Sequence, residues 1–164
     1  AQGAAGNARL RMVLSRDGGI ALQIGEISNF PSRLRVALRP MPADRRDFRL
    51  RHKTSDRAFY DDAREACGAP EVIFEDAEGF ITEGSLTSVF VRIDGRLATP
   101  PLGRGLLPGI LRGRLLASGE AVEQDIRRSD LGNGFFVGNS VRGLVPATLD
   151  ECQRIFARKL PIRS

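Results

Sequence analysis

The amino-acid sequence predicts an α+β domain built on a mixed, barrel-like sheet. Short alternating or wholly apolar stretches, typical of strands, recur along the 164 residues. Some are separated only by turn residues such as Asp94-Gly95, which predicts hairpins, and two helical stretches lie between others. Hairpins and helices in this irregular order argue against a simple array of β-α-β units. The length is that of one domain.

The strands are predicted from alternation and turn residues. Residues 8–27 predict a hairpin with Asp17-Gly18-Gly19 as its turn. Asn29-Phe30-Pro31-Ser32 then breaks the pattern, so we divide the chain into residues 1–28 and 29–164. Further short strands are expected over residues 33–38, 49–53, 72–74, 80–82, 89–91, 121–124, 135–137 and 144–147.

Helices are expected between these strands. Thr54-Ser55-Asp56 offers capping residues for a helix over residues 57–67. Pro108-Gly109 introduces a second helix over residues 110–118, and residues 128–131 predict a helical turn. Lys53 is therefore expected at a strand-to-helix junction.

Composition excludes several classes of function. No apolar run approaches the ~18 residues of a membrane span, so we expect no membrane association. A single histidine, His52, and two distant cysteines, Cys67 and Cys152, argue against a metal site or a disulfide scaffold and fit a reducing cytoplasm. The net charge is +5, but aromatic residues make up only 6% of the chain and no stacking motif interleaves with the basic residues, so nucleic-acid binding is not expected.

Lys53 is the first candidate for chemistry. Of the 25 basic residues, only Lys53 and Lys159 are lysines, so a lysine here is a candidate for a role that arginine cannot fill. Such a role is covalent bonding to an aldehyde. A strand over residues 49–53 would place Arg49, Arg51 and Lys53 on one face, where the cations would favour the neutral amine. The alternative is a solvated basic segment.

Three later segments could bind an ionic group. Glu83 lies in an apolar strand and needs a partner such as a protonated ring nitrogen, unless it faces water at a sheet edge. Leu107-Pro108-Gly109-Ile110-Leu111-Arg112 starts a helix whose free N–H groups suit a phosphate, or it is an ordinary helix start. Gly138-Asn139-Ser140 suits a phosphate or carboxylate, or it is a turn.

Together, and in this order, these four segments resemble the fold-type-IV pyridoxal-phosphate (PLP) enzymes, the class IV aminotransferase group. The family's motifs stand here as Lys53, residues 82–90, residues 107–112 and residues 138–140, and the match runs over about residues 33–147. The resemblance implies that residues 29–164 are the large C-terminal PLP-binding domain of the D-amino-acid-aminotransferase-like fold. Residues 1–28 would be the last hairpin of a small N-terminal domain that is mostly absent.

The resemblance also implies roles for individual residues. Lys53 would bind the cofactor's aldehyde covalently and then transfer protons, and Glu83 would keep the pyridine nitrogen protonated. The phosphate would lie against Gly109, Ile110 and Leu111. Asn139 and Ser140 would give further contacts near it. Two positions depart from the family pattern, because Ser88 replaces a common Asn and Leu111 replaces a common Thr.

Two segments favour aminodeoxychorismate lyase within the family. His52-Lys53-Thr54-Ser55-Asp56-Arg57 is similar to the lyases' H-K-T-T-x-R, and Asn139-Ser140-Val141-Arg142-Gly143 to their N-S-x-R-G. Arg57 and Arg142 are thus candidates for binding substrate carboxylates. The implied reaction converts 4-amino-4-deoxychorismate into 4-aminobenzoate and pyruvate, in folate biosynthesis.

Two alternatives remain open. One is an aminotransferase acting on branched-chain or D-amino acids, and the other is an inactive fragment that lacks the N-terminal half of the site. The resemblance further implies a small-molecule substrate, a cytoplasmic homodimer, and fusion to or association with an aminodeoxychorismate synthase component.

Overall fold

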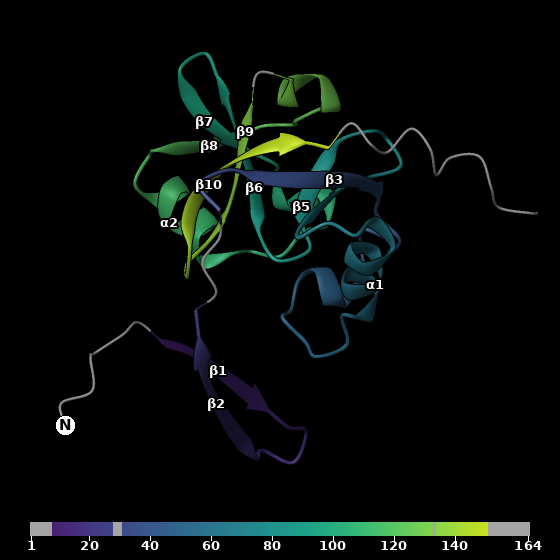
Figure 1. The fold of residues 1–164 in the computed structure, drawn as a ribbon, viewed down its shortest axis with the longest axis vertical. Helices are drawn as coiled ribbons and strands as arrows, with labels where there is room; N and C mark the ends of the chain where they lie inside the picture. Colours follow the sequence, from purple (N-terminus) through teal and green to yellow (C-terminus); the bar gives the residue numbers. More distant parts are fainter. Residues whose placement is uncertain (1–7, 28–30, 133, 151–164) are drawn as a thin grey trace, which may run out of the picture. The chain divides into compact units, whose positions relative to one another are not determined.

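The structure is a computed structural model, which describes residues 8–27, 31–132 and 134–150. The chain divides into two compact units, residues 1–31 and residues 32–164. The first unit contains a two-stranded hairpin, and the second contains an eight-stranded sheet with its helices (Figure 1). The assignment of the hairpin to a smaller domain stays a prediction.

The hairpin has one apolar face. Strands β1 (Ala8–Leu14) and β2 (Ile20–Glu26) pair antiparallel, which agrees with the prediction over residues 8–27. Leu10 lies opposite Ile24, Met12 opposite Leu22, and Leu14 opposite Ile20. Because alternate residues of a strand share a face, these six side chains lie together, and each is between 62% and 79% exposed.

The second unit is a mixed sheet, as predicted. Its strands run in the spatial order β5-β4-β3-β10-β9-β6-β7-β8. Their bounds are β3 (Leu34–Pro40), β4 (Val72–Glu75), β5 (Ile81–Gly84), β6 (Ser88–Ile93), β7 (Arg96–Thr99), β8 (Ala121–Glu123), β9 (Phe135–Asn139) and β10 (Gly143–Leu149). The pairs β3–β4, β3–β10 and β7–β8 are parallel, and the other pairs are antiparallel.

The two edges of this sheet meet, so the sheet is barrel-like. Phe80, just before β5, forms an antiparallel bridge with Arg127, which follows β8. The N–H of Ile81 donates to the carbonyl of Ile126 over 2.8 Å. Edge strands otherwise expose unpaired backbone groups, and closure removes that exposure.

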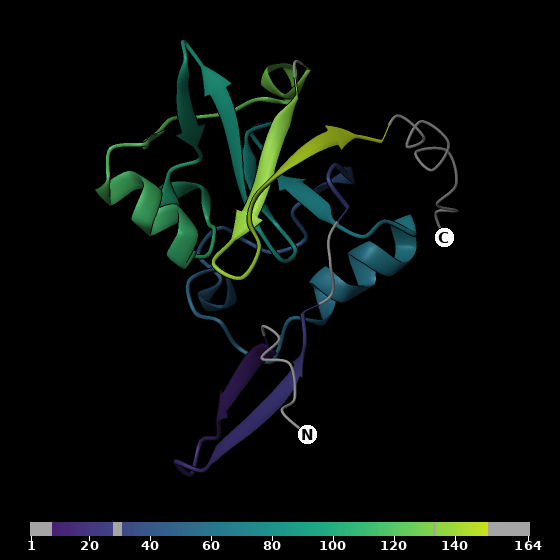
Figure 2. The ribbon, with the colours of Figure 1, turned by 60° about the vertical axis from the view of Figure 1, so that its left-hand side comes forward.

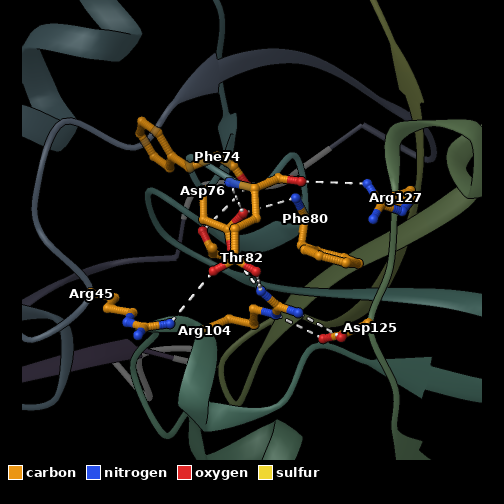
Figure 3. Close-up of polar contacts among 9 residues, drawn as sticks. Arg45, Phe74, Asp76, Phe80, Thr82, Arg104, Asp125 and Arg127 are labelled. Carbon is orange, nitrogen blue, oxygen red and sulfur yellow. Dashed lines mark hydrogen bonds and ion pairs between the residues drawn. The ribbon is translucent and has the colours of Figure 1, made fainter.

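We call this closure the barrel seam. It is bridged by four charged side chains and one aromatic ring, those of Asp76, Phe80, Arg104, Asp125 and Arg127 (Figure 3). Arg104 pairs with Asp125 over 2.6 Å and with Asp76 over 3.2 Å. The ring of Phe80 contacts two guanidinium groups, with Arg104 3.7 Å and Arg127 3.9 Å from its centroid. The planar guanidinium of Arg104 thus connects the segment around Asp76 with the segment around Asp125.

Within the described residues there are two α-helices, which lie at opposite ends of the sheet in Figures 1 and 2, and three short 3-10 helices in the connections between the longer elements. Their bounds are α1 (Ala58–Cys67), α2 (Ile110–Ala117), η1 (Phe48–Leu50), η2 (Leu102–Arg104) and η3 (Arg128–Leu131). Tyr60 of α1 packs in one core cluster with Leu50 and Phe74. Leu115 of α2 packs in another with Phe90.

The prediction of a strand over residues 49–53 is wrong. Residues 48–50 form η1, because Asp47 caps it by accepting the N–H of Arg49 over 2.9 Å. The Arg49 side chain also turns back to Asp47, over 2.7 Å. The alternating basic residues therefore do not share one strand face. Lys53 lies in the segment between η1 and α1.

The predicted capping of α1 is also wrong. The N-cap position is Arg57, which makes no side-chain capping hydrogen bond, rather than Thr54, Ser55 or Asp56. The Asp94-Gly95 hairpin is as predicted, since both residues have positive φ, 50° and 81°, as a tight hairpin turn requires. Among the described residues, no helix is long and apolar enough to cross a membrane.

Candidate active site

Glu83 is a buried carboxylate at the centre of the candidate site. It lies inside β5 with only 3% of its surface exposed, so it does not occupy an exposed sheet edge. The hydroxyl of Tyr60 donates to its Oε1, and the N–H of Leu107 donates to its Oε2 over 3.0 Å. Burial raises the pKa of Glu83, while these two hydrogen bonds and the nearby Arg57 act in the opposite direction.

Arg57 stacks on the ring of Tyr60, the residue whose hydroxyl donates to Glu83. Its guanidinium lies over the ring of Tyr60, 4.1 Å from the centroid. Its Nη1 is buried and makes no hydrogen bond within residues 8–27, 31–132 and 134–150. A buried cationic donor of this kind calls for an anionic oxygen.

A second buried carboxylate organises the loop after Glu83. Glu71 is fully buried and accepts hydrogen bonds from the hydroxyls of Ser85 and Thr87, the latter over 2.8 Å. The N–H groups of Val72 and Leu86 also donate to it. Burial raises the pKa of Glu71, against the effect of these hydrogen bonds. The loop from β5 to β6 is therefore folded around one carboxylate.

The start of α2 leaves backbone donors free of the helix. Gly109 is its N-cap and provides no side-chain capping bond, and the first helical carbonyl bond runs from Gly113 N–H to Gly109. The N–H groups of Ile110 and Leu111 thus have no acceptor within the helix. A Cβ atom on Gly109 would lie 2.8 Å from the Ser88 hydroxyl, so the helix start is packed against β6.

Gly138 brings α2 against β9. A Cβ atom built on Gly138 would overlap the carbonyl oxygen of Gly143 and lie 2.8 Å from Cδ2 of Leu111. Gly138 is also paired with Ser88 in the sheet. The Leu111 side chain, which replaces a common threonine hydroxyl, is thus a packing contact at this place. Three of the four predicted motifs meet around Ser88.

The other predicted residues are placed as follows. Asn139 holds the β9–β10 turn, since its Oδ1 accepts the N–H groups of Val141 and Arg142 and its Nδ2 donates to the Leu86 carbonyl. Ser140 is exposed in that turn, and Arg142 is half-buried. Lys53 is exposed in the segment that leads to Arg57.

Two important residues were not among the sequence candidates. Tyr60 and Glu71 make the contacts that fix Glu83 and its loop. Tyr60 follows Arg57 by three residues, a spacing that places side chains on one helix face. That spacing, with the chain's single tyrosine, is the signal that could have identified it.

Comparisons with known proteins point to one family. A family model described as amino-transferase class IV matches residues 1–149. A solved structure named "Putative amino-acid aminotransferase" from Mesorhizobium loti is 39% identical, with a TM-score of 0.80. It is matched over 87% of this chain and 73% of its own.

Two further relatives extend the comparison. A Schizosaccharomyces pombe protein named "Putative aminodeoxychorismate lyase" is 30% identical over 138 residues, 77% of this chain and 59% of that protein. This chain thus spans less than two thirds of that relative's length. The PLP-bound form of "a hypothetical aminotransferase" from Mycobacterium tuberculosis shares the fold, with a TM-score of 0.74 at 23% identity over 90% of this chain and 62% of that one.

Proposed function

Because the chain belongs to the class IV aminotransferase family, whose enzymes depend on PLP, we propose that it acts as an aminodeoxychorismate lyase. The reaction would release pyruvate from 4-amino-4-deoxychorismate and leave 4-aminobenzoate, a step of folate biosynthesis. The observation that carries this choice is Arg57, a cation held beside Glu83 with a buried Nη1 that has no hydrogen-bond partner in the described residues.

The residues present fit the cofactor. Glu83 is an ionisable carboxylate in a buried place, which suits a cationic ring nitrogen. The uncapped start of α2 provides the N–H groups of Ile110 and Leu111 for a phosphate, with Gly109 packed closely beneath. Lys53 provides an exposed primary amine for the aldehyde. We propose that Asn139 and Ser140 support the phosphate side through the β9–β10 turn.

The chemistry then divides among the chain's own residues. PLP, when bound, supplies an electron sink. Lys53 would remove the proton from the ring carbon that bears the substrate's amine. The C–O bond to the enolpyruvyl group would break, and that group would take up a proton to become pyruvate. Glu83 would hold the pyridine nitrogen protonated throughout. Arg57 and Arg142 would bind the substrate's carboxylates.

A product assay tests this proposal. Purified chain loaded with PLP is incubated with 4-amino-4-deoxychorismate, and 4-aminobenzoate and pyruvate are measured separately. Equal amounts of both products, lost in Lys53→Ala and reduced in Arg57→Gln, are expected. Absence of both products, while PLP still bonds to Lys53, would instead favour the alternative of a fragment that binds cofactor without turning over substrate.

Amino transfer is the second candidate. It is favoured by the 39% identity to the protein named as an amino-acid aminotransferase. Both reactions need Lys53 and Glu83 and differ in where the proton returns. Incubation with branched-chain amino acids or D-amino acids would then yield a keto acid and pyridoxamine phosphate, and no 4-aminobenzoate would form from the lyase substrate.

We also propose a homodimer in the cytoplasm, working with or fused to an aminodeoxychorismate synthase component. The exposed apolar face of the β1–β2 hairpin supports an association, since exposed apolar patches of this kind mark interaction surfaces. Light scattering after size-exclusion chromatography tests the dimer. A mass equal to one chain at micromolar concentration would contradict it.

A further inference from the structure

We propose that Tyr60, with Arg57 stacked on its ring, is a positioning residue that fixes the Glu83 carboxylate for a protonated ring nitrogen. This inference rests on the role proposed above for Glu83. It is carried by the Tyr60–Glu83 hydrogen bond and by the 4.1 Å between the Arg57 guanidinium and the tyrosine ring.

The ring of Tyr60 has little freedom to move. It is only 1% exposed, and it packs edge-on against Phe74 with 5.4 Å between ring centroids. The ring of Phe59 also contacts it, with 4.1 Å between the two ring centroids. Because the ring is enclosed, its hydroxyl has a defined place, and that place is against Oε1 of Glu83. The other oxygen, Oε2, is fixed by the N–H of Leu107.

Tyr60 acts as a neutral donor. Burial, together with the adjacent Glu83 carboxylate, raises the pKa of Tyr60 well above its usual value. The hydroxyl therefore stays protonated and donates to the ionised Glu83 carboxylate.

The surroundings of Glu83 have opposing effects on its pKa. Burial and the nearby Glu71 raise the pKa of Glu83, whereas Tyr60, the Leu107 N–H and Arg57 lower it. Loss of the Tyr60 hydroxyl removes one of the lowering contributions, so Glu83 would hold its proton to a higher pH. A neutral Glu83 cannot balance a protonated ring nitrogen. The hydroxyl thus matters most at the acid end of the working range.

PLP titrations of the whole chain across pH 6–8.5 test this proposal. Tyr60→Phe keeps the ring and removes only the hydroxyl. The apparent Kd for PLP, read from cofactor absorbance, is expected to rise about tenfold at the acid end and less at the alkaline end, relative to the parent chain. A loss of equal size at every pH would indicate a merely structural role and would overturn the proposal.

Two more variants keep the test decisive. If Tyr60→Phe fails to fold, Arg57→Gln replaces it and should shift the same pH profile in the same direction. Arg127→Gln is the matched control, because Arg127 lies over the ring of Phe80 at 3.9 Å, and it should leave the profile unchanged. A control that shifted equally would overturn the proposal.

Glu83→Gln distinguishes the role of Tyr60 from the role of Glu83 itself. If it weakens PLP binding and Tyr60→Phe does not, the positioning role fails while the role of Glu83 stands. If Glu83→Gln binds PLP as the parent chain does, with an unchanged spectrum, the proposed role of Glu83 fails as well.

Discussion

Leu107 and Glu83 are joined by a hydrogen bond of 3.0 Å from backbone N–H to Oε2. This contact links the two central motifs of the chain, since Glu83 lies inside β5 and Leu107 precedes the start of α2. A carboxylate suited to a ring nitrogen and a helix start suited to a phosphate are thereby held in one fixed relation. The spacing of the two groups is set by backbone, which is the least adjustable part of a site.

Shortening the carboxylate tests that relation. Glu83→Asp keeps the charge but withdraws it by one methylene from Tyr60 and Leu107. We expect the apparent Kd for PLP to rise about tenfold or more, because hydrogen bonds to a charged group are lost. Fluorescence titration measures this. Glu120→Asp, at an exposed position, is the control, and an unchanged Kd in Glu83→Asp would contradict the account.

Glu71 gives a prediction about stability and pH. Its folded-state pKa is raised by burial above the ordinary value of 4.5, so the folded chain keeps a proton that the unfolded chain has lost. The contribution of Glu71 to the free energy of unfolding is then complete below about pH 4.5, and it is lost as pH rises through the folded-state pKa. Relative to the parent chain, Glu71→Gln should gain stability as pH increases, measured by urea unfolding from pH 4.5 to 8. A stability difference between Glu71→Gln and the parent chain that stayed constant over this pH range would refute it.

Gly138 gives a steric prediction. Gly138→Ala should destabilise the fold by about 1–3 kcal/mol, because the new Cβ meets the backbone at Gly143 as well as the Leu111 side chain. Gly113→Ala is its matched control. Nothing lies within 4 Å of a Cβ there, so the change should stabilise α2 by about 0.5–1 kcal/mol. Equal effects of the two substitutions in denaturant unfolding would show that the close packing at Gly138 is not needed.

The barrel seam predicts that an arginine is required at position 104. Arg104→Lys keeps the charge but loses the planar contact with Phe80 and the paired contact with Asp125 (Figure 3). We expect a loss of about 1 kcal/mol in the free energy of unfolding. Arg114→Lys, at an exposed position of α2, should have no measurable effect. A neutral Arg104→Lys would mean that charge alone closes the seam.

The sequence predicted the elements with strong local signals. Asp94-Gly95 specifies its hairpin turn by residue type, and Pro108-Gly109 marks the start of α2. Glu83 was identifiable because a glutamate inside an apolar strand needs a partner. Its burial in β5 agrees with that reasoning.

The rest depends on contacts that no local pattern encodes. The alternation of basic and other residues over 49–53 predicted a strand, but capping by Asp47 places residues 48–50 in η1 instead. The closure between Phe80 and Arg127 joins residues far apart in the chain. Tyr60 lies in an amphipathic helix whose sequence does not distinguish it from an ordinary core residue. Its hydrogen bond to Glu83 depends on the packing of α1 beside β5, which the sequence does not show.

Lys53 is the residue on which the central claim depends, and one measurement tests it most directly. The chain is incubated with PLP, reduced with borohydride, and analysed by intact mass and peptide mapping. The account predicts one phosphopyridoxyl group on Lys53, none on Lys159, and none in Lys53→Ala. An adduct on Lys159 alone, or no adduct at saturating PLP, would contradict it.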